Sequence, residues 1–150
     1  MPGGGPEPSL APRPAESIDP RVPIPDAPAP GEVDPQLANR LEALVADARG
    51  GVSAFESREA EASRLAAGAG PAASESWVAA QQSLSRLVEQ WGVTTRAAAE
   101  IDALAAARLQ SQKWIGTANR QAIASAAERV EAINTAQAAA IARIREQLER

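Results

Sequence analysis

Residues 74–112 read SESWVAAQQSLSRLVEQWGVTTRAAAEIDALAAARLQSQ, and this stretch decides the fold. It is a run of good helix formers with two large aromatic side chains, Trp77 and Trp91, spaced fourteen residues apart. Its large apolar residues recur at intervals of three, four and seven: Trp77, Leu84, Leu87, Trp91, Ile101 and Leu104. A helix that turns once every ~3.6 residues carries such residues on one stripe. The stretch therefore predicts a long helix whose apolar stripe must be covered by the segments on either side.

Another helix is predicted before this stretch, over residues 34–67. Asp34 can accept hydrogen bonds from the free amides of a first turn, and Pro35 suits the first helical position, where no donor is needed. Gly70 and Pro71 lie just beyond the predicted end and favour a turn there. An apolar face runs through the segment. It consists of Leu37, Leu41, Leu44, Ala48, Val52, Phe55, Ala62 and Leu65.

Two glycine sites can bend these helices. Gly50-Gly51 costs about 2 kcal/mol relative to alanine, and Ser53 with Glu56 has the spacing of a capping box just after it. Two shorter helices are therefore one interpretation of residues 34–67. We favour a single kinked helix, because the apolar face continues across the glycines. Gly92, next to Trp91, is the second site, and it predicts either a bend or a close approach of a neighbouring helix.

A third helix is predicted over residues 117–150. Its apolar stripe advances by alternating steps of three and four residues. The stripe contains Ile123, Ala126, Val130, Ile133, Gln137, Ala140, Ile144 and Gln147, with Ile141 and Leu148 beside it. Gln137 could fix the register through a buried hydrogen bond or mark the edge of the stripe, and we favour the edge.

The length of the chain beyond Ser74 decides the topology. A single helix over residues 74–150 would be about 115 Å long, whereas a helix over residues 34–67 could cover only about 50 Å of it. A fold back near Gly116-Thr117 instead gives three segments of similar length that can bury one another. The sequence therefore predicts an all-α antiparallel three-helix bundle with helices at about 34–67, 74–112 and 117–150.

Residues 1–33 differ in composition from the rest of the chain. Eleven of the twelve prolines lie at or before Pro35, and residues 1–35 carry six acidic residues against Arg13 and Arg21. A segment with so many prolines and so few large apolar residues cannot offset the entropy lost on ordering. We predict a disordered acidic arm that acts as a tether. Pro20 and Pro23 also have the spacing of a PxxP ligand, which is the alternative interpretation.

Composition excludes several classes of function. The chain contains no cysteine and no histidine, and residues 36–150 carry thirteen acidic and thirteen basic residues. Zinc sites, thiol nucleophiles and histidine-based proton transfer are therefore not expected, and a balanced charge does not favour nucleic acid. The carboxylate pairs Glu56/Glu59 and Glu128/Glu131 are expected to be solvated. We expect no enzyme activity, no catalytic or metal-binding residue, no cofactor and no small-molecule ligand.

The large apolar side chains provide candidate anchors for packing or for interaction. They are Trp77, Trp91, Trp114, Phe55, Ile101 and Ile133. Trp114-Ile115-Gly116 resembles the Trp-x-Gly turn of the small secreted helical-hairpin proteins of the WXG family, and that resemblance implies a turn between two helices. The chain departs from the family in its proline-rich arm, its additional helix and its lack of tyrosine.

These observations predict a non-catalytic structural or protein-interaction module held on a flexible tether. Residues 36–150 contain only 25 Leu, Val, Ile, Phe and Trp residues, so we expect a protein partner or self-association to add buried area. The alternative is a helical binding protein for an apolar or lipid-like ligand, with the three tryptophans lining a cleft.

The compartment is open to two interpretations. No stretch of about eighteen apolar residues predicts a membrane span, and no signal peptide is expected at Met1, so the chain as given reads as cytoplasmic. Residues 3–9, GGGPEPS, resemble the tether that follows the lipidated cysteine of bacterial envelope lipoproteins. That resemblance implies a periplasmic, envelope-tethered protein if a signal lies upstream.

Overall fold

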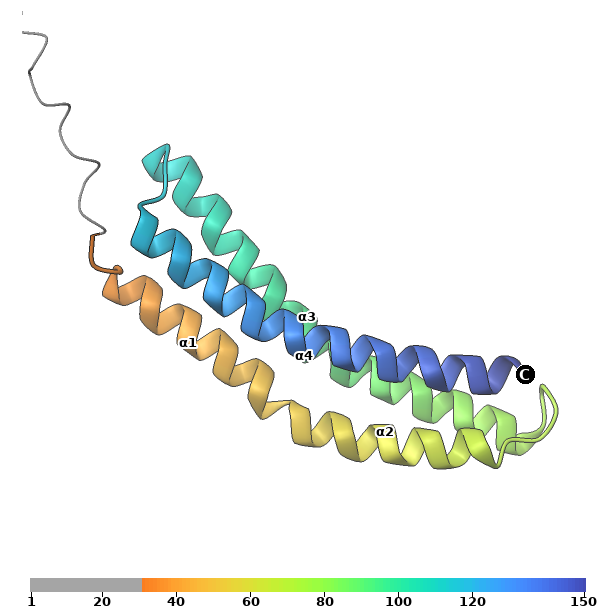
Figure 1. The fold of residues 1–150 in the computed structure, drawn as a ribbon. Helices are drawn as coiled ribbons and strands as arrows, with labels where there is room; N and C mark the ends of the chain where they lie inside the picture. The colour runs from red at the N-terminus through yellow and green to blue at the C-terminus, as the bar shows by residue number, and fades with distance from the viewer. Residues whose placement is uncertain (1–30) are drawn as a thin grey trace, which may run out of the picture.

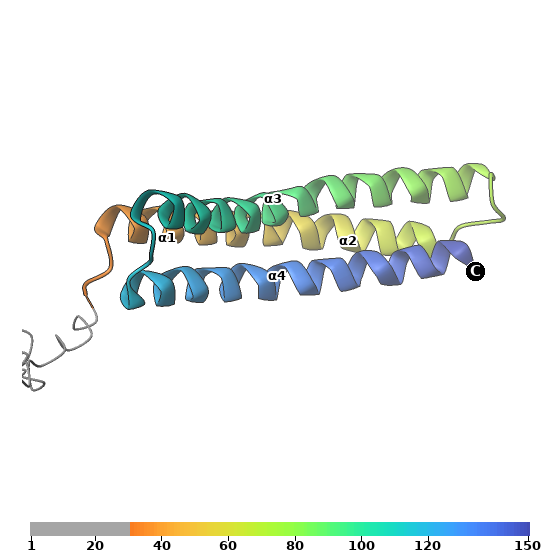
Figure 2. The same cartoon turned by 90° about the horizontal axis from the view of Figure 1, so that it is seen from above.

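The computed structural model describes residues 31–150, which form three helical rods that lie side by side (Figures 1 and 2). The first rod consists of α1 (Pro35–Gly50) and α2 (Val52–Ala67) in succession, the second is α3 (Glu75–Gln112) and the third is α4 (Thr117–Glu149). The predicted all-α antiparallel three-helix bundle is confirmed, and the helix ends lie within one residue of those predicted. Most of the predicted tether, residues 1–30, lies outside the described residues.

Side-chain caps form the starts of α1 and α3, whereas α4 begins after Gly116 without one. The Asp34 carboxylate accepts a hydrogen bond of 2.8 Å from the backbone N–H of Gln36, and Pro35 takes the first helical position. The Ser74 hydroxyl accepts one of 3.3 Å from the backbone N–H of Trp77. These bonds satisfy donors that the first turn of a helix cannot pair internally.

The turn between α3 and α4 is built differently from the sequence prediction. The predicted fold back was placed near Gly116-Thr117, but the left-handed residue that ends α3 after Gln112 is Lys113, with φ 63°. The backbone N–H of Lys113 bonds to the carbonyl of Leu109 at 3.0 Å, which satisfies an orphan carbonyl of the last turn. Gly116 instead precedes α4 with extended backbone. The helix stop therefore rests on a lysine in a conformation that glycine usually supplies.

The first rod bends at Gly51, as the kinked-helix interpretation predicted. Gly51 has φ −78° and ψ −15°, and its N–H and C=O still bond to Asp47 and Phe55 at 3.2 Å and 3.0 Å. Because the backbone stays close to helical, α1 and α2 remain joined while the rod changes direction, and the whole bundle curves at this level (Figure 1).

The neighbouring helix leaves little room for a side chain at position 51. A Cβ added to Gly51 would lie 3.2 Å from Cγ1 of Val93 on α3, which is a tight contact. At Gly92 an added Cβ would meet only the Arg96 guanidinium, at 3.9 Å. The close approach considered for Gly92 is therefore wrong, since the glycine that allows it lies on the first rod.

Two apolar clusters fill the bundle, one on each side of the bend. The first, which we call the α1 cluster, contains Leu37, Leu41, Leu44, Val45, Ala48, Ala97, Ile101, Ala126 and Val130. The second, the α2 cluster, contains Phe55, Ala62, Ala66, Ala80, Leu84, Leu87, Ala140, Ile141, Ile144 and Leu148. Each cluster takes residues from all three rods, so the apolar stripe of α3 is covered on both sides, as its sequence requires.

A layer of polar side chains lies near the bend, between the two clusters. We call it the polar waist, and it consists of Gln90, Trp91, Thr94, Asn134 and Gln137. The indole N–H of Trp91 donates to Asn134 Oδ1 at 2.7 Å, which joins α3 to α4. Thr94 and Gln137 are buried, but Thr94 Oγ1 and Gln137 Oε1 have no hydrogen-bond partner. The edge position favoured for Gln137 is wrong, because its side chain is only 5% exposed.

Alanine substitutions at the two neighbouring glycines should separate helix propensity from the close approach. Gly50→Ala should raise the free energy of unfolding by about 0.5–1 kcal/mol, because an added Cβ meets no atom within 4 Å. Gly51→Ala should raise the free energy of unfolding by less, or lower it, because Val93 must move. Urea denaturation of both variants measures the difference, and equal gains would contradict the tight contact.

The unpartnered hydroxyl of the waist predicts a stabilising substitution. Thr94→Val keeps the shape of the side chain and removes a buried polar atom, so it should raise the free energy of unfolding by about 1 kcal/mol. Thr95→Val is the matched control, since the Thr95 hydroxyl donates to the carbonyl of Gly92 at 3.2 Å. Thermal and urea unfolding should show no such gain for the control. A loss of stability in Thr94→Val would show that its hydroxyl is satisfied.

Candidate functional site

The six predicted anchors do not share one role. Phe55 and Ile101 are buried, in the α2 and α1 clusters respectively. Trp77 and Trp91 are half-buried against the α2 cluster, and Ile133 is half-buried against the α1 cluster. These five side chains therefore contribute to packing.

Trp114 is the exception, with 60% of its surface exposed. Packing is therefore the wrong role for Trp114, because its position in the α3–α4 turn leaves it beyond both clusters. Its role as an interaction anchor stays a prediction.

The three tryptophans do not line a common cleft. Trp77 donates its indole N–H to the carbonyl of Leu148 at 3.3 Å, at the end of the bundle where α4 finishes. Trp91 lies in the polar waist and Trp114 beside the α3–α4 turn. The rise of a helix puts about 21 Å between Trp77 and Trp91, and Trp114 follows Trp91 by twenty-three more residues, or about 34 Å of helix. The predicted tryptophan-lined cleft is therefore wrong.

An exposed apolar surface lies at the α3–α4 turn. We call it the tip, and it consists of Leu109, Lys113, Trp114 and Ile115. Leu109 is 53% exposed and Trp114 60% exposed, and they are two of the three large apolar residues exposed to this degree in the described chain. The third, Val78, stands near the opposite end of α3. No acidic residue occurs between residues 103 and 127, whereas Lys113 and nearby arginines do.

Asp34 holds the three rods together just below the tip. Its carboxylate pairs with Arg108 on α3, and its backbone N–H donates to Asn119 Oδ1 on α4 at 3.0 Å. The hydrogen bond from Arg108, followed by that from the backbone N–H of Gln36, lowers the pKa of the Asp34 carboxyl. The side chain of Asn119 thus connects α4 to the start of α1.

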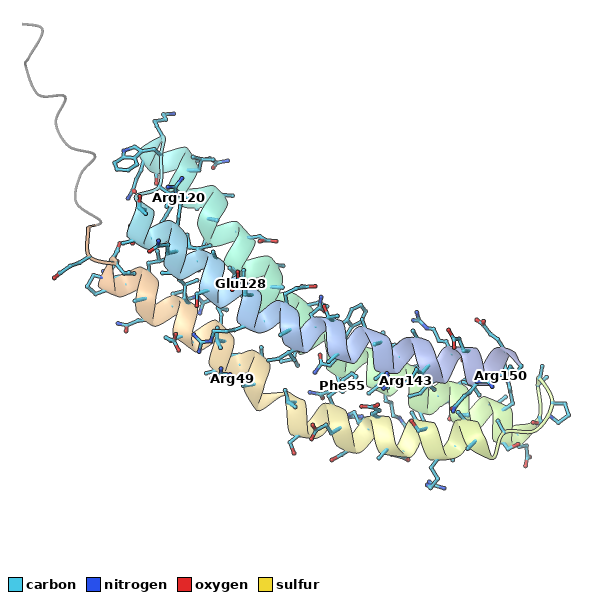
Figure 3. The ribbon with its side chains drawn as sticks, in the orientation of Figure 1. Arg49, Phe55, Arg120, Glu128, Arg143 and Arg150 are labelled. Carbon is cyan, nitrogen blue, oxygen red and sulfur yellow. The ribbon has the colours of Figure 1, made fainter. Side chains whose placement is uncertain are left out.

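A groove runs between α2 and α4, and Phe55, which is labelled in Figure 3, belongs to its lining. Its volume is about 340 Å³, and its walls are mainly apolar. The lining residues are Val52, Phe55, Glu56 and Glu59 from α2 and Ala132, Ile133, Ala136 and Gln137 from α4. Alanine at positions 132 and 136 leaves this seam open, because a methyl group cannot reach the opposite helix.

Two ion pairs join α4 to the first rod, one near each end of the groove. Arg129 forms two bonds to Glu42 on α1, at 2.7 Å and 3.2 Å, and Arg143 bonds to Glu59 on α2 at 3.2 Å. The hydrogen bond from Arg129 lowers the pKa of the Glu42 carboxyl and raises the pKa of Arg129. Glu59 is therefore half-buried and paired, rather than fully solvated as the sequence suggested.

Two other kinds of feature are absent from the described residues. No group of three or more acidic side chains gathers there to hold a metal ion, and none of the helices between residues 31 and 150 is long and apolar enough to cross a membrane. Comparisons of the chain with protein-family models, curated proteins and solved structures give no match.

The sequence analysis predicted neither the groove nor the bonds from Asp34 that join the three rods below the tip. The groove depends on which helix faces meet at the α2–α4 seam, and periodicity alone does not give that pairing. One signal was present: the stripe of α4 that joins Arg129 to Arg143 carries only alanine in between, at Ala132, Ala136 and Ala139.

The Asp34 carboxylate predicts a pH dependence of stability. Because its pKa is lowered in the folded chain, the carboxylate stabilises the fold above the ordinary aspartate value of about 3.9 and loses this contribution as the pH falls through its folded pKa. Asp34→Asn can still cap α1 but cannot form the ion pair. Urea denaturation should show a deficit for the variant at pH 7 that shrinks at pH 3. Glu128→Gln is the control, and a deficit of equal size at both pH values would contradict the assignment.

Proposed function

We propose that the chain is a non-catalytic helical module that binds a protein partner through its tip, with the proline-rich segment as its tether. The observation that carries the proposal is the exposure of Trp114 beside Leu109 at the end of the bundle. The partner is a different protein or a second copy of the chain.

The energetics of tryptophan support an interaction at this point. Tryptophan is enriched among the residues that dominate binding energy at protein interfaces. Trp77 and Trp91 each direct the indole N–H to an acceptor inside the bundle, whereas Trp114 projects from the turn with most of its surface exposed. Leaving so much apolar area in water forgoes a stabilisation of roughly 1–2 kcal/mol, which a partner can recover by covering it.

The tip is also held in place. Asp34 connects α1 to α3 through Arg108 and to α4 through Asn119, so the two helices that carry the tip are fixed relative to each other. A surface that is ordered before binding loses less entropy when the partner arrives. The absence of acidic residues from 103 to 127 favours a partner surface with acidic groups around an apolar centre.

Site-specific photo-crosslinking tests the proposal directly. A benzophenone side chain placed at position 114 of the full chain, in the cells that make the protein, should give a discrete adduct with a partner or a second copy. Leu109→Ser in the same chain should abolish that adduct. The matched control places the benzophenone at position 78, the other exposed apolar site. Equal adducts at 78 and 114, or none at 114, would refute the tip as the binding surface.

Removal of the Trp114 indole should leave the fold intact. Trp114→Ser should change the free energy of unfolding by less than about 0.5 kcal/mol, because the side chain contacts little of the bundle. Trp91→Ala should cost about 3 kcal/mol, since it removes a packed indole and its bond to Asn134. Unfolding in urea compares the two, and a large loss for Trp114→Ser would mean that its role is packing after all.

A further inference from the structure

The groove between α2 and α4 is a second surface, separate from the tip. It lies near the bend, whereas the tip stands at the far end of α3 (Figure 1). Its volume of about 340 Å³ falls at the lower end of the range in which proteins bind small molecules. Val52 and Ile133 are half-buried in its lining and Phe55 lies buried beneath it, so the walls are mainly apolar, as a binding site for an organic molecule requires.

The groove contains an unsatisfied polar group. Gln137 belongs to its lining and is 5% exposed, and Oε1 of this side chain has no hydrogen-bond partner. Buried amide oxygens are almost always bonded, and this one lies below the groove surface, so the amide must turn to present it to a donor on a bound molecule. The terminal torsion of a glutamine side chain is soft, which allows the amide to turn its oxygen towards the groove.

Carboxylates define the charge of the ligand. Glu56 and Glu59 both line the groove. Glu59 is paired with Arg143, whereas Glu56 is exposed and forms no ion pair with another described residue. An unsatisfied acceptor and an unpaired carboxylate in one groove both favour a donor that is positively charged.

The ion pairs on either side of the groove limit the size of the occupant. Arg129 and Arg143 lie fourteen residues apart on α4, or about 21 Å, and they pair with Glu42 on α1 and with Glu59 on α2. A helix laid along the seam would have to displace both pairs. A small molecule fits between them without breaking either.

We propose that this groove binds a small apolar ammonium compound. Its aromatic or short aliphatic body packs against Val52, Phe55 and Ile133, and its N–H groups bond to Gln137 Oε1 and to the carboxylate of Glu56. The site goes beyond the proposed function, because it uses neither Leu109 nor Trp114. It also departs from the sequence-based expectation that no small molecule binds.

Three probes of the same size test the charge and the place of binding. 2-Phenylethylammonium, 2-phenylethanol and 3-phenylpropionate are titrated into ¹⁵N-labelled full chain, and amide shifts are followed by NMR. The ammonium probe should give saturable shifts at Val52, Phe55, Ile133 and the side-chain amide of Gln137. It should bind more tightly than the alcohol, and the alcohol more tightly than the carboxylate.

Two substitutions separate the acceptor from the carboxylate. Gln137→Leu should weaken the ammonium probe about tenfold, and Glu56→Gln about threefold. Glu128→Gln, an exposed acid outside the groove, is the matched control and should change nothing. Glu56 is exposed, so its variant keeps the test decisive even if Gln137→Leu disturbs the fold.

Several outcomes would overturn the proposal. They are the absence of saturable shifts, equal affinity for the three probes, shifts spread outside the groove, and an equal effect of Glu128→Gln. Concentration-dependent shifts at the groove in the absence of any probe would also overturn it, because a second copy of the chain would then be the occupant.

Discussion

The apolar stripe of α3 is the constraint on which the structure depends. It runs the length of a 38-residue helix, and no single neighbour of ordinary length can cover it. The first rod covers one side and α4 the other, and the buried residues of α3, among them Leu84, Leu87 and Ile101, contribute to both apolar clusters. Burial of such side chains is the main favourable term in folding. Folding the chain back at the two turns is therefore favoured because it covers this stripe.

The bend and the polar waist follow from how the two clusters meet. Near Gly51 the first rod comes close to Val93, and Thr94 and Gln137 interrupt the apolar packing at the same level. Buried polar groups cost stability, but they penalise alternative registers of the helices, because a shift would bury them in an apolar cluster. The waist therefore fixes how the three rods align, and the open α2–α4 seam beside it is a consequence of that alignment.

Local signals in the sequence predicted most of the fold. The caps at Asp34 and Ser74, the turn at Gly70-Pro71 and the periodic stripes act within a few residues, so they can be read without knowing the partners. The end of α3 at Gln112 was predicted, but the left-handed conformation of Lys113 was not, because lysine rarely adopts it.

Properties that depend on how the helices pair could not be predicted from the sequence. The burial of Gln137, the exposure of Trp114 and the ion pairs of Asp34 and Arg143 all depend on which faces meet. For that reason the groove was found only in three dimensions, and the alternative of a tryptophan-lined cleft failed because Trp77, Trp91 and Trp114 lie at different levels along the bundle.

The central claim, that the chain folds back between Lys113 and Gly116 to cover the stripe of α3, is tested most directly by a distance. Spin labels at positions 78 and 146 of the full chain, diluted with unlabelled protein, can be measured by double electron–electron resonance. The account predicts a separation below about 30 Å, because adjacent helices are only about 10 Å apart and Trp77 contacts Leu148. A separation near 100 Å, the length of about 68 residues of unbroken helix, would contradict it.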